Sequence, residues 1–121
     1  MMASIRLLLK DTFEVSVMVA DDQSLRDTIE HGQFDLVIAD LSIPISSGEN
    51  VARFLKRLDP DLRVIILSVH DEPVAVQECQ AAGAKGFVLK RATVNDLIPA
   101  VETVLRGDTY VSPAIQAKQE K

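Results

Sequence analysis

The stretch LVIADLSIPISSG, residues 36–48, sets four apolar side chains directly before Asp40 and then places Pro44 and Gly48 in the segment that follows. A short, continuous apolar run is typical of a strand that is covered on both faces of a sheet. A carboxylate at the end of such a strand stands at the edge of the sheet, where the chain has to turn. The stretch therefore predicts a buried strand that presents Asp40 to a crevice.

Strand and helix patterns alternate along the rest of the chain. Apolar alternation or continuous apolar runs predict strands at 13–20, 36–39, 64–67 and 86–90. Apolar residues at helical spacing predict helices at 21–32, 48–60, 71–83 and 93–107. Alternation of this kind predicts an α/β domain with a parallel sheet and right-handed crossovers.

The two ends of the chain complete this organisation. Segment 1–12 has Ile5, Leu8 and Leu9 on one helical face, so we interpret it as a helix; the rival interpretation is a strand over IRLLL. The C-terminal residues are polar and predict a frayed tail. We expect one domain over 1–113 and a tail over 114–121.

The composition excludes several classes of protein. The 121 residues are 47% hydrophobic, enough for one core, and the net charge is −5. An acidic chain of this size is a poor candidate for direct nucleic-acid binding, which needs clustered Lys and Arg. The single cysteine, Cys79, has no partner for an internal disulfide. No run is long enough to span a membrane and no signal peptide is recognisable, so we expect a cytoplasmic protein.

Three chemically different side chains follow three successive predicted strands. Asp40 ends the first, Ser68 the second and Lys90 the third. The carboxyl ends of parallel strands meet in one crevice, so these groups should lie together. A carboxylate can act as a nucleophile, while an ammonium and a hydroxyl stabilise phosphoryl oxygens. The constellation predicts a phosphoryl-transfer site; His70, close by, has no partner motif that makes it a metal ligand.

Four stretches carry a family resemblance: DLVIADLSIPISSG, VIILSVHDE, AAGAKGFVLK and AVETVLRGDTYVSP. In order and spacing they resemble the receiver domain of bacterial response regulators of two-component systems. Within that CheY-like superfamily they are most similar to the LuxR/FixJ-type branch. The resemblance extends from residue 13 to residue 113 without a gap. It implies a flavodoxin-like, doubly wound parallel sheet and a signalling domain rather than an enzyme.

The resemblance also implies a role for individual residues. Asp40 would be the phosphoacceptor, Ser68 the hydroxyl that senses the phosphoryl group, and Lys90 the lysine that contacts it. Phe87 takes the position of the aromatic switch. Ser42 would offer its backbone carbonyl to a magnesium ion. The implied partners are a histidine kinase or phosphotransfer protein, with no direct contact to nucleic acid or membrane.

One part of the family pattern is expected to be missing. Receivers begin with another strand followed by an acidic pair that holds Mg²⁺, and by alignment that pair falls before residue 1. Asp11, Asp21 and Asp22 do not take its place, because they belong to other elements of the predicted order. Mg²⁺ needs several oxygen ligands in octahedral geometry. We therefore expect a weak metal site, with Asp40 and one carbonyl as its protein ligands.

The same alignment implies that the sheet lacks an interior strand. The family's strand order of 2-1-3-4-5 makes the missing strand an interior one, between 13–20 and 36–39. Unpaired interior edges are costly. We therefore expect either a four-stranded sheet, in which 13–20 moves beside 36–39, or a homodimer formed by strand exchange or edge pairing.

Three functions remain open at this point. The first is a receiver that accepts a phosphoryl group on Asp40. The second is a degenerate receiver that acts only in protein interaction or dimerisation, because the acidic pair is absent. The third is a small hydrolase with Asp40 as nucleophile, which would need a second acid in the loop that follows; residues 41–47 contain none.

Overall fold

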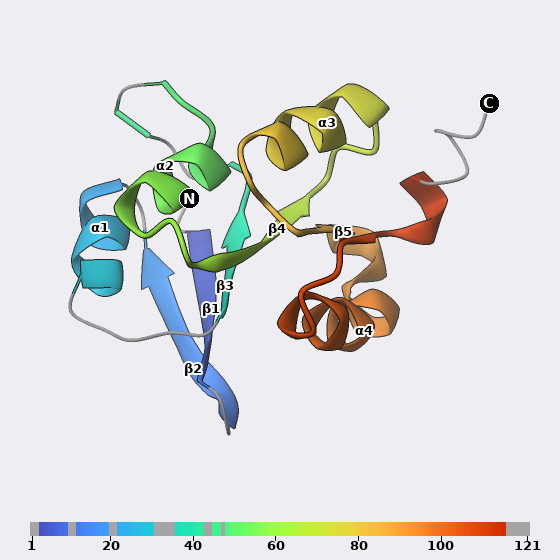
Figure 1. Ribbon diagram of the computed structural model, residues 1–121, viewed down its shortest axis with the longest axis horizontal. Coiled ribbons are helices and arrows are strands. Elements are labelled where there is room, and N and C mark those ends of the chain that lie inside the picture. Colours follow the sequence, from blue (N-terminus) through green and yellow to red (C-terminus); the bar gives the residue numbers. More distant parts are fainter. Residues whose placement is uncertain are drawn as a thin grey trace.

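The computed structural model describes residues 3–9, 12–19, 22–30, 36–42, 45–46 and 48–115, with side chains from residue 23 onward. Asp11, Asp21 and Pro44 lie outside the described residues, as do residues 116–121 of the predicted tail. The described part forms one sheet covered by helices on both faces (Figure 1). The predicted α/β class is confirmed, and four neighbouring strands form the predicted parallel sheet within a larger mixed one.

The sheet has six strands in the order β2-β1-β3-β4-β5-β6. Its parallel part consists of β3 (Leu36–Asp40), β4 (Arg63–Ser68), β5 (Gly86–Leu89) and β6 (Tyr110–Val111). Three of these strands coincide with predicted ones. The fourth, β6, is a two-residue strand that the sequence analysis missed, because so short a segment carries no periodicity.

The prediction of a helix over 1–12 is wrong. Residues Ala3–Leu9 form strand β1, which pairs antiparallel with β2 (Thr12–Val19) on one side and with β3 on the other. The run IRLLL fits either periodicity, and pairing on both sides satisfies backbone groups that an open sheet would leave exposed. The total of four strands was therefore an underestimate. It is β1, not 13–20 or a second chain, that lies beside β3.

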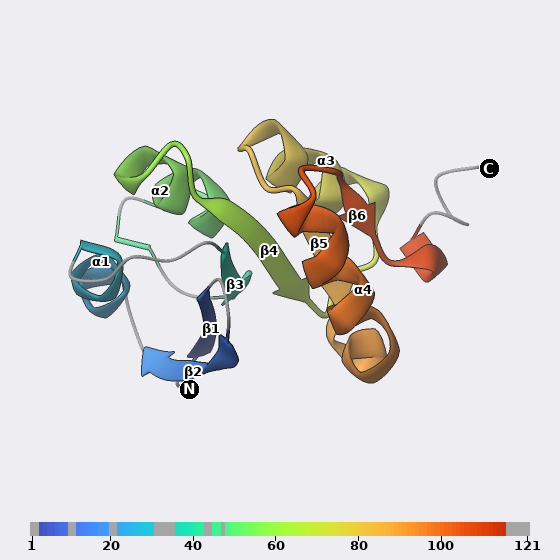
Figure 2. The ribbon, with the colours of Figure 1, turned by 60° about the horizontal axis from the view of Figure 1, so that its bottom comes forward.

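The helices divide between the two faces of the sheet (Figure 2). One face carries α1 (Asp22–Glu30), α2 (Val51–Leu58) and α3 (Pro73–Ala81), and the other carries α4 (Thr93–Leu105). Successive residues of β3 point to opposite faces. Val37 and Ala39 accordingly join the core under α1–α3, while Leu36 and Ile38 join the core under α4. No helix in the described part is both long and apolar enough to cross a membrane.

A glycine in β5 keeps the sheet close to α4. A Cβ on Gly86 would lie 2.6 Å from Ile65 Cγ1 and 3.2 Å from Val104 Cγ2, so β4 and α4 leave no room for a methyl group. We expect Gly86→Ala to lower the free energy of unfolding by about 1–3 kcal/mol through overpacking, as measured by urea denaturation. The control is Val94→Ala, which changes a side chain that is 95% exposed and should shift the free energy by less than about 0.5 kcal/mol. Equal stability of the two variants would show that β5 can move away from its neighbours.

Candidate functional site

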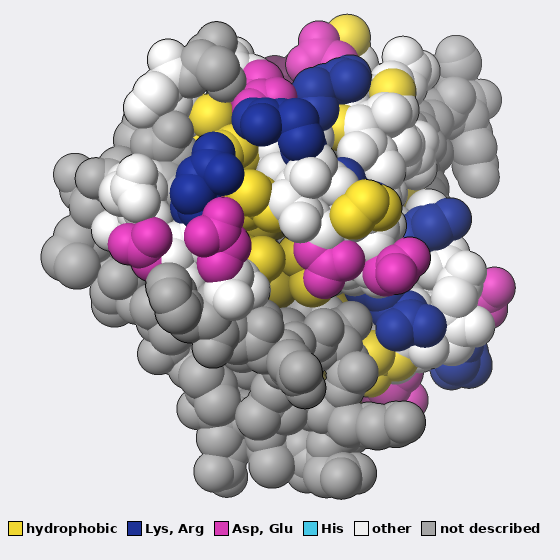
Figure 3. All heavy atoms as spheres, turned by 60° about the vertical axis from the view of Figure 1, so that its left-hand side comes forward, with side chains coloured by type: hydrophobic (Ala, Val, Ile, Leu, Met, Phe, Trp, Pro, Cys, Tyr) yellow, Lys and Arg dark blue, Asp and Glu magenta, His cyan; other side chains and the backbone are white. Residues whose placement is uncertain are grey.

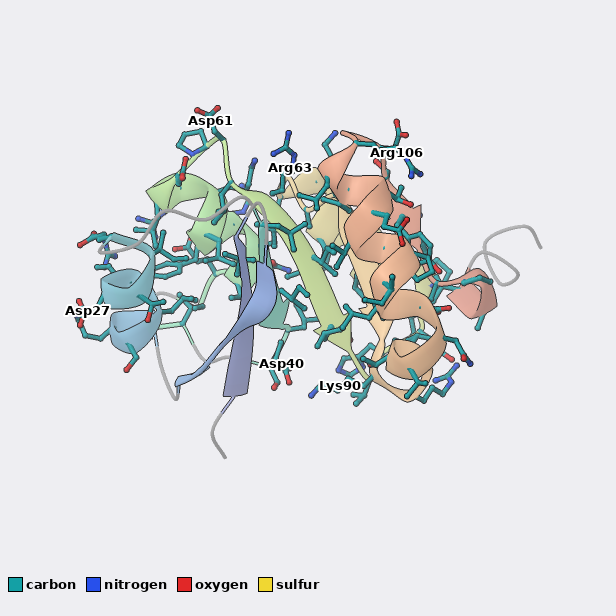
Figure 4. All side chains as sticks on the ribbon, turned by 90° about the horizontal axis from the view of Figure 1, so that it is seen from below. Asp27, Asp40, Asp61, Arg63, Lys90 and Arg106 are labelled. Atoms are coloured by element: carbon teal, nitrogen blue, oxygen red, sulfur yellow. The ribbon has the colours of Figure 1, made fainter. Side chains whose placement is uncertain are left out.

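The ends of three parallel strands place Asp40, Ser68 and Lys90 together, as the sequence predicts. Asp40 is the last residue of β3 and Ser68 the last residue of β4, while Lys90 follows β5 and begins the short helix η1 (Lys90–Ala92). The parallel register aligns Asp40 with Leu67, and Ser68 with Leu89. Figure 4 shows Asp40 and Lys90 at one edge of the sheet, with Asp61, Arg63 and Arg106 at the opposite edge.

A small, open cavity lies between these strand ends. Its volume is about 100 Å³, well below the roughly 300–1,000 Å³ of pockets that enclose drug-sized ligands. A group of phosphate size therefore suits it better than a nucleotide. The cavity is lined by Asp40, Leu41, Ser42, Ser68, Val69, His70 and Lys90.

Both oxygens of the Asp40 carboxylate contact polar groups of neighbouring residues. Ser42 donates twice to Oδ1, from its backbone nitrogen at 2.8 Å and from its hydroxyl Oγ at 2.7 Å. Lys90 Nζ forms an ion pair with Oδ2. The Asp40 side chain is 14% exposed and that of Lys90 is 37% exposed, so the pair lies at the boundary between core and solvent.

These contacts determine the ionisation state of Asp40. Burial by itself would raise the pKa of the carboxyl group, but the hydrogen bonds from Lys90 and Ser42 and the charge on Lys90 outweigh it. The net result is a pKa below the ordinary value of 3.8, so Asp40 is ionised at neutral pH. An ionised carboxylate is the form that can act as a nucleophile.

Ser68, which lines the cavity, and Phe87, on the neighbouring strand, are both buried. The Ser68 side chain is buried, and its Oγ accepts a hydrogen bond of 2.9 Å from the backbone nitrogen of His70. As an acceptor in that bond, the hydroxyl keeps its own proton for donation elsewhere. Phe87 is buried in the core under α1–α3 and pairs with Ile66 in the sheet, so its ring points away from solvent.

The described residues do not fit a magnesium ion. Mg²⁺ prefers six oxygen ligands, and no group of three or more His, Cys, Asp or Glu residues that could hold a metal occurs in the described ranges. Asp40 and the Ser42 carbonyl remain as candidates, and both Asp40 oxygens already accept protein donors. Asp22 begins α1 beyond β2, which is two strands from β3.

Two features of the site escaped the sequence analysis. Ser42 was expected to act through its backbone carbonyl, whereas its hydroxyl and N–H group contact Asp40. The signal was present, because Ser and Asp two residues apart often form local turns of this kind. The second feature is an ion pair of 3.2 Å between Arg91 and Asp71, which joins η1 to the segment after β4. No sequence pattern indicated that pair.

Comparison with known proteins identifies related chains. A family model described as response regulator receiver domain matches residues 1–102. The chain is 42% identical over 81 residues to the transcriptional regulatory protein UhpA of Salmonella typhimurium, covering 67% of this chain and 40% of that protein. It is 36% identical over 111 residues to the oxygen regulatory protein NreC of Staphylococcus carnosus, covering 91% and 51%. The chain thus spans about half the length of such relatives.

Solved structures show the same fold. A LuxR-family two-component response regulator from Aurantimonas sp. matches with a TM-score of 0.72 and 26% identity, over 82% of this chain and 71% of that one. The response regulator RcsB of Salmonella typhimurium matches with a TM-score of 0.76 and 24% identity, over 85% of this chain and 52% of that one. The latter likeness concerns the fold alone.

Removal of the Lys90 charge should change the titration of Asp40. We expect Lys90→Gln to raise the pKa of Asp40, since burial then acts against a weaker set of partners. The wild-type contribution of Asp40 to stability is complete above the unfolded pKa and is lost as the pH falls through the lower folded pKa. The variant should show a smaller loss over this acid range, and carbon-13 NMR of the carboxyl group measures the pKa directly.

Arg91→Gln is the matched control for this titration, because Arg91 pairs with Asp71 instead of Asp40. It should leave the pKa of Asp40 in place. An Asp40 pKa that stays the same in Lys90→Gln would contradict the ion pair.

Proposed function

The chain belongs to the response regulator receiver domain family, and on this premise we propose that it accepts a phosphoryl group on Asp40 from a histidine kinase or phosphotransfer protein. The observation that carries the proposal is the ionised Asp40 carboxylate, which lines a phosphate-sized cavity together with one ammonium group and two hydroxyl groups. Members of this family are generally signalling modules, and the proposed role is a cytoplasmic switch without catalytic turnover of its own.

The side chains divide the work of phosphoryl transfer. An Asp40 oxygen attacks the phosphorus atom of the donor, and the bond from phosphorus to the donor breaks with its electron pair leaving on the donor. Lys90 is close enough to neutralise charge on the phosphoryl oxygens, and Ser68 has a proton to donate to one of them. Family members typically use Mg²⁺ to screen this charge. The described residues do not fit that ion, so no step is assigned to it.

The proposed response to phosphorylation is a rearrangement of two buried residues, Ser68 and Phe87. A phosphoryl group that draws the Ser68 hydroxyl toward it would weaken the hydrogen bond from His70 and loosen the segment that leads into α3. Phe87, which lies on the neighbouring strand, is the proposed aromatic switch that repacks in response. Both residues are almost fully buried in the structure, so their rearrangement would require the core to move.

The proposed domain is the receiver over 1–113, followed by a tail over 114–121. Ile115 extends the packed part slightly beyond that boundary, because it is fully buried in the core under α1–α3. Figure 3 shows Lys, Arg, Asp and Glu side chains intermixed on the face that carries α1 and α2. Ion pairs such as Arg26–Glu30 and Arg57–Glu49 contribute to this mixture. A mixed face on an acidic chain does not favour nucleic acid as a direct partner.

The proposal predicts that the acceptor is a single residue. Incubation with acetyl phosphate, with and without Mg²⁺, should increase the intact mass of the wild-type chain by one phosphoryl group. Asp40→Asn should abolish the adduct and leave the chain folded, with a lower stability at neutral pH because Lys90 loses its ion-pair partner. Asp71→Asn is the control, because Asp71 does not line the cavity and its loss should leave the adduct in place. Phosphorylation of Asp40→Asn would show that another residue is the acceptor.

A degenerate receiver that acts in protein interaction is the second candidate function. It is favoured by the misfit to Mg²⁺ and by the edge strand β2, whose eight residues contain Glu14 as the one charged residue and no proline. Edge strands with few charges are templates for pairing with another chain. Because β1 already fills the interior of the sheet, strand exchange has no gap to fill, and the proposed homodimer would pair through β2.

Light scattering tests this second candidate. If the chain dimerises by edge pairing, the wild type should have the mass of two chains at high concentration. Ser16→Lys should have the mass of one chain, because a lysine on an edge strand opposes pairing. Gln80→Lys, which adds one positive charge at an exposed position of α3 as Ser16→Lys does on β2, should leave the dimer intact. A wild-type chain that is monomeric at every concentration, or a dimer that Ser16→Lys leaves unchanged, would count against edge pairing.

A further inference from the structure

Ser112 connects the end of β5 to the segment that follows β6. It comes directly after the last residue of β6 and is fully buried. Its backbone nitrogen donates to the Phe87 carbonyl at 3.0 Å, which extends the pairing of the two strands by one bond. Its hydroxyl Oγ accepts a hydrogen bond of 3.0 Å from the backbone nitrogen of Leu89, the residue directly before Lys90. One residue therefore holds the end of β5 at two points.

The Ser112 hydroxyl replaces a backbone acceptor at the point where β6 ends. In a parallel pair that continued in the same register, the Leu89 N–H group would donate to the carbonyl of Ser112. That carbonyl instead accepts a hydrogen bond of 2.9 Å from the Ile115 nitrogen, because the chain turns into a helical segment at 113–115. Leu89 is fully buried, and a buried N–H group without an acceptor is costly. The hydroxyl thus keeps β5 paired up to its last residue.

The same end of β5 carries the cation of the site. Lys90 follows Leu89 directly, and its Nζ forms the ion pair with Asp40. The Lys90 carbonyl accepts a hydrogen bond of 2.8 Å from the Thr93 hydroxyl, which holds the backbone on the other side of this residue. The position of the Lys90 backbone therefore depends on two side chains, Ser112 before it and Thr93 after it.

We propose that Ser112 is a positioning residue, which fixes the end of β5 so that Lys90 can stabilise the phosphoryl group transferred to Asp40. The inference rests on the proposed phosphoacceptor function. In the step that it assists, an Asp40 oxygen forms a bond to the phosphorus of acetyl phosphate, the bond from phosphorus to acetate breaks, and acetate takes the electron pair. The Lys90 ammonium neutralises charge on the phosphoryl oxygens and keeps its proton. A displacement of about 1 Å can slow such a reaction by about a hundredfold, so a small shift of the strand end is sufficient.

The experiment measures the rate of adduct formation with acetyl phosphate, with intact mass as the readout. Ser112→Ala should slow the reaction by roughly three- to tenfold, the size expected for one lost hydrogen bond. Ser112→Cys fills the site but offers only a weak acceptor, so it should also slow the reaction. The control is Val101→Ala, which removes buried apolar atoms from the core under α4. It should lower the melting temperature and leave the rate unchanged.

A second measurement examines the position of Lys90 without any phosphoryl donor. The nitrogen-15 NMR signal of Lys90 Nζ should shift in Ser112→Ala and stay in place in Val101→Ala. Hydrogen exchange of the Leu89 amide should be faster in Ser112→Ala, because that group loses its acceptor. A purely structural role of Ser112 would change the exchange and leave the Lys90 signal where it is.

A double variant tests whether Ser112 acts through Lys90. In a Lys90→Gln background, Ser112→Ala should slow adduct formation no further, because the cation that it positions is absent. Equal slowing in both backgrounds, a wild-type rate in Ser112→Ala or Ser112→Cys, or an unmoved Lys90 signal would overturn this inference alone. If Lys90→Gln forms no measurable adduct, the Lys90 signal decides the inference. A wild-type chain that forms no adduct would overturn the proposed function and the inference together.

Discussion

The parallel pairing of β3, β4 and β5 is the constraint on which the site depends. The three strands run in the same direction with their registers aligned, so their carboxyl ends share one edge of the sheet. Apolar residues cover both faces, which leaves the strand ends as the place where polar side chains can reach solvent. A shift in the register of any of these strands would move its apolar side chains out of the two cores. The register is therefore fixed, and it brings Asp40, Ser68 and Lys90 together.

The charge in the cavity is balanced by the chain itself. Lys90 and the two donors of Ser42 hold the Asp40 carboxylate, so this group does not depend on a bound cation to stay ionised near a hydrophobic core. A phosphoryl group brings additional negative charge to the same place. A receiver that accepts a phosphoryl group has to stabilise this additional charge, whereas a degenerate receiver needs only the fold. Among the described residues, Lys90 is the side chain placed most directly to stabilise it.

Sequence patterns predicted the parts of the fold that periodicity and strand order determine. The continuous apolar runs located β3, β4 and β5, and the rule that parallel strands end together located the site. Segment 1–12 was misjudged because its apolar density suits a helix as well as a strand, and the pairing with β3 that decides between them is a tertiary contact. The contacts of the Ser42 hydroxyl depend on side-chain rotamers, which no spacing rule describes.

The direction of β1 has a consequence for labelling the molecule. Because β1 runs antiparallel to β3, with Ile5 opposite Ala39, the chain enters the sheet at the edge where Asp40 lies. The Ala3 end of β1 therefore lies near the carboxyl end of β3. A fluorophore attached at this end of β1 would respond to events at Asp40, whereas a bulky label there would obstruct access by a partner. This end of the strand is thus a reporter position and a poor place for an inert label.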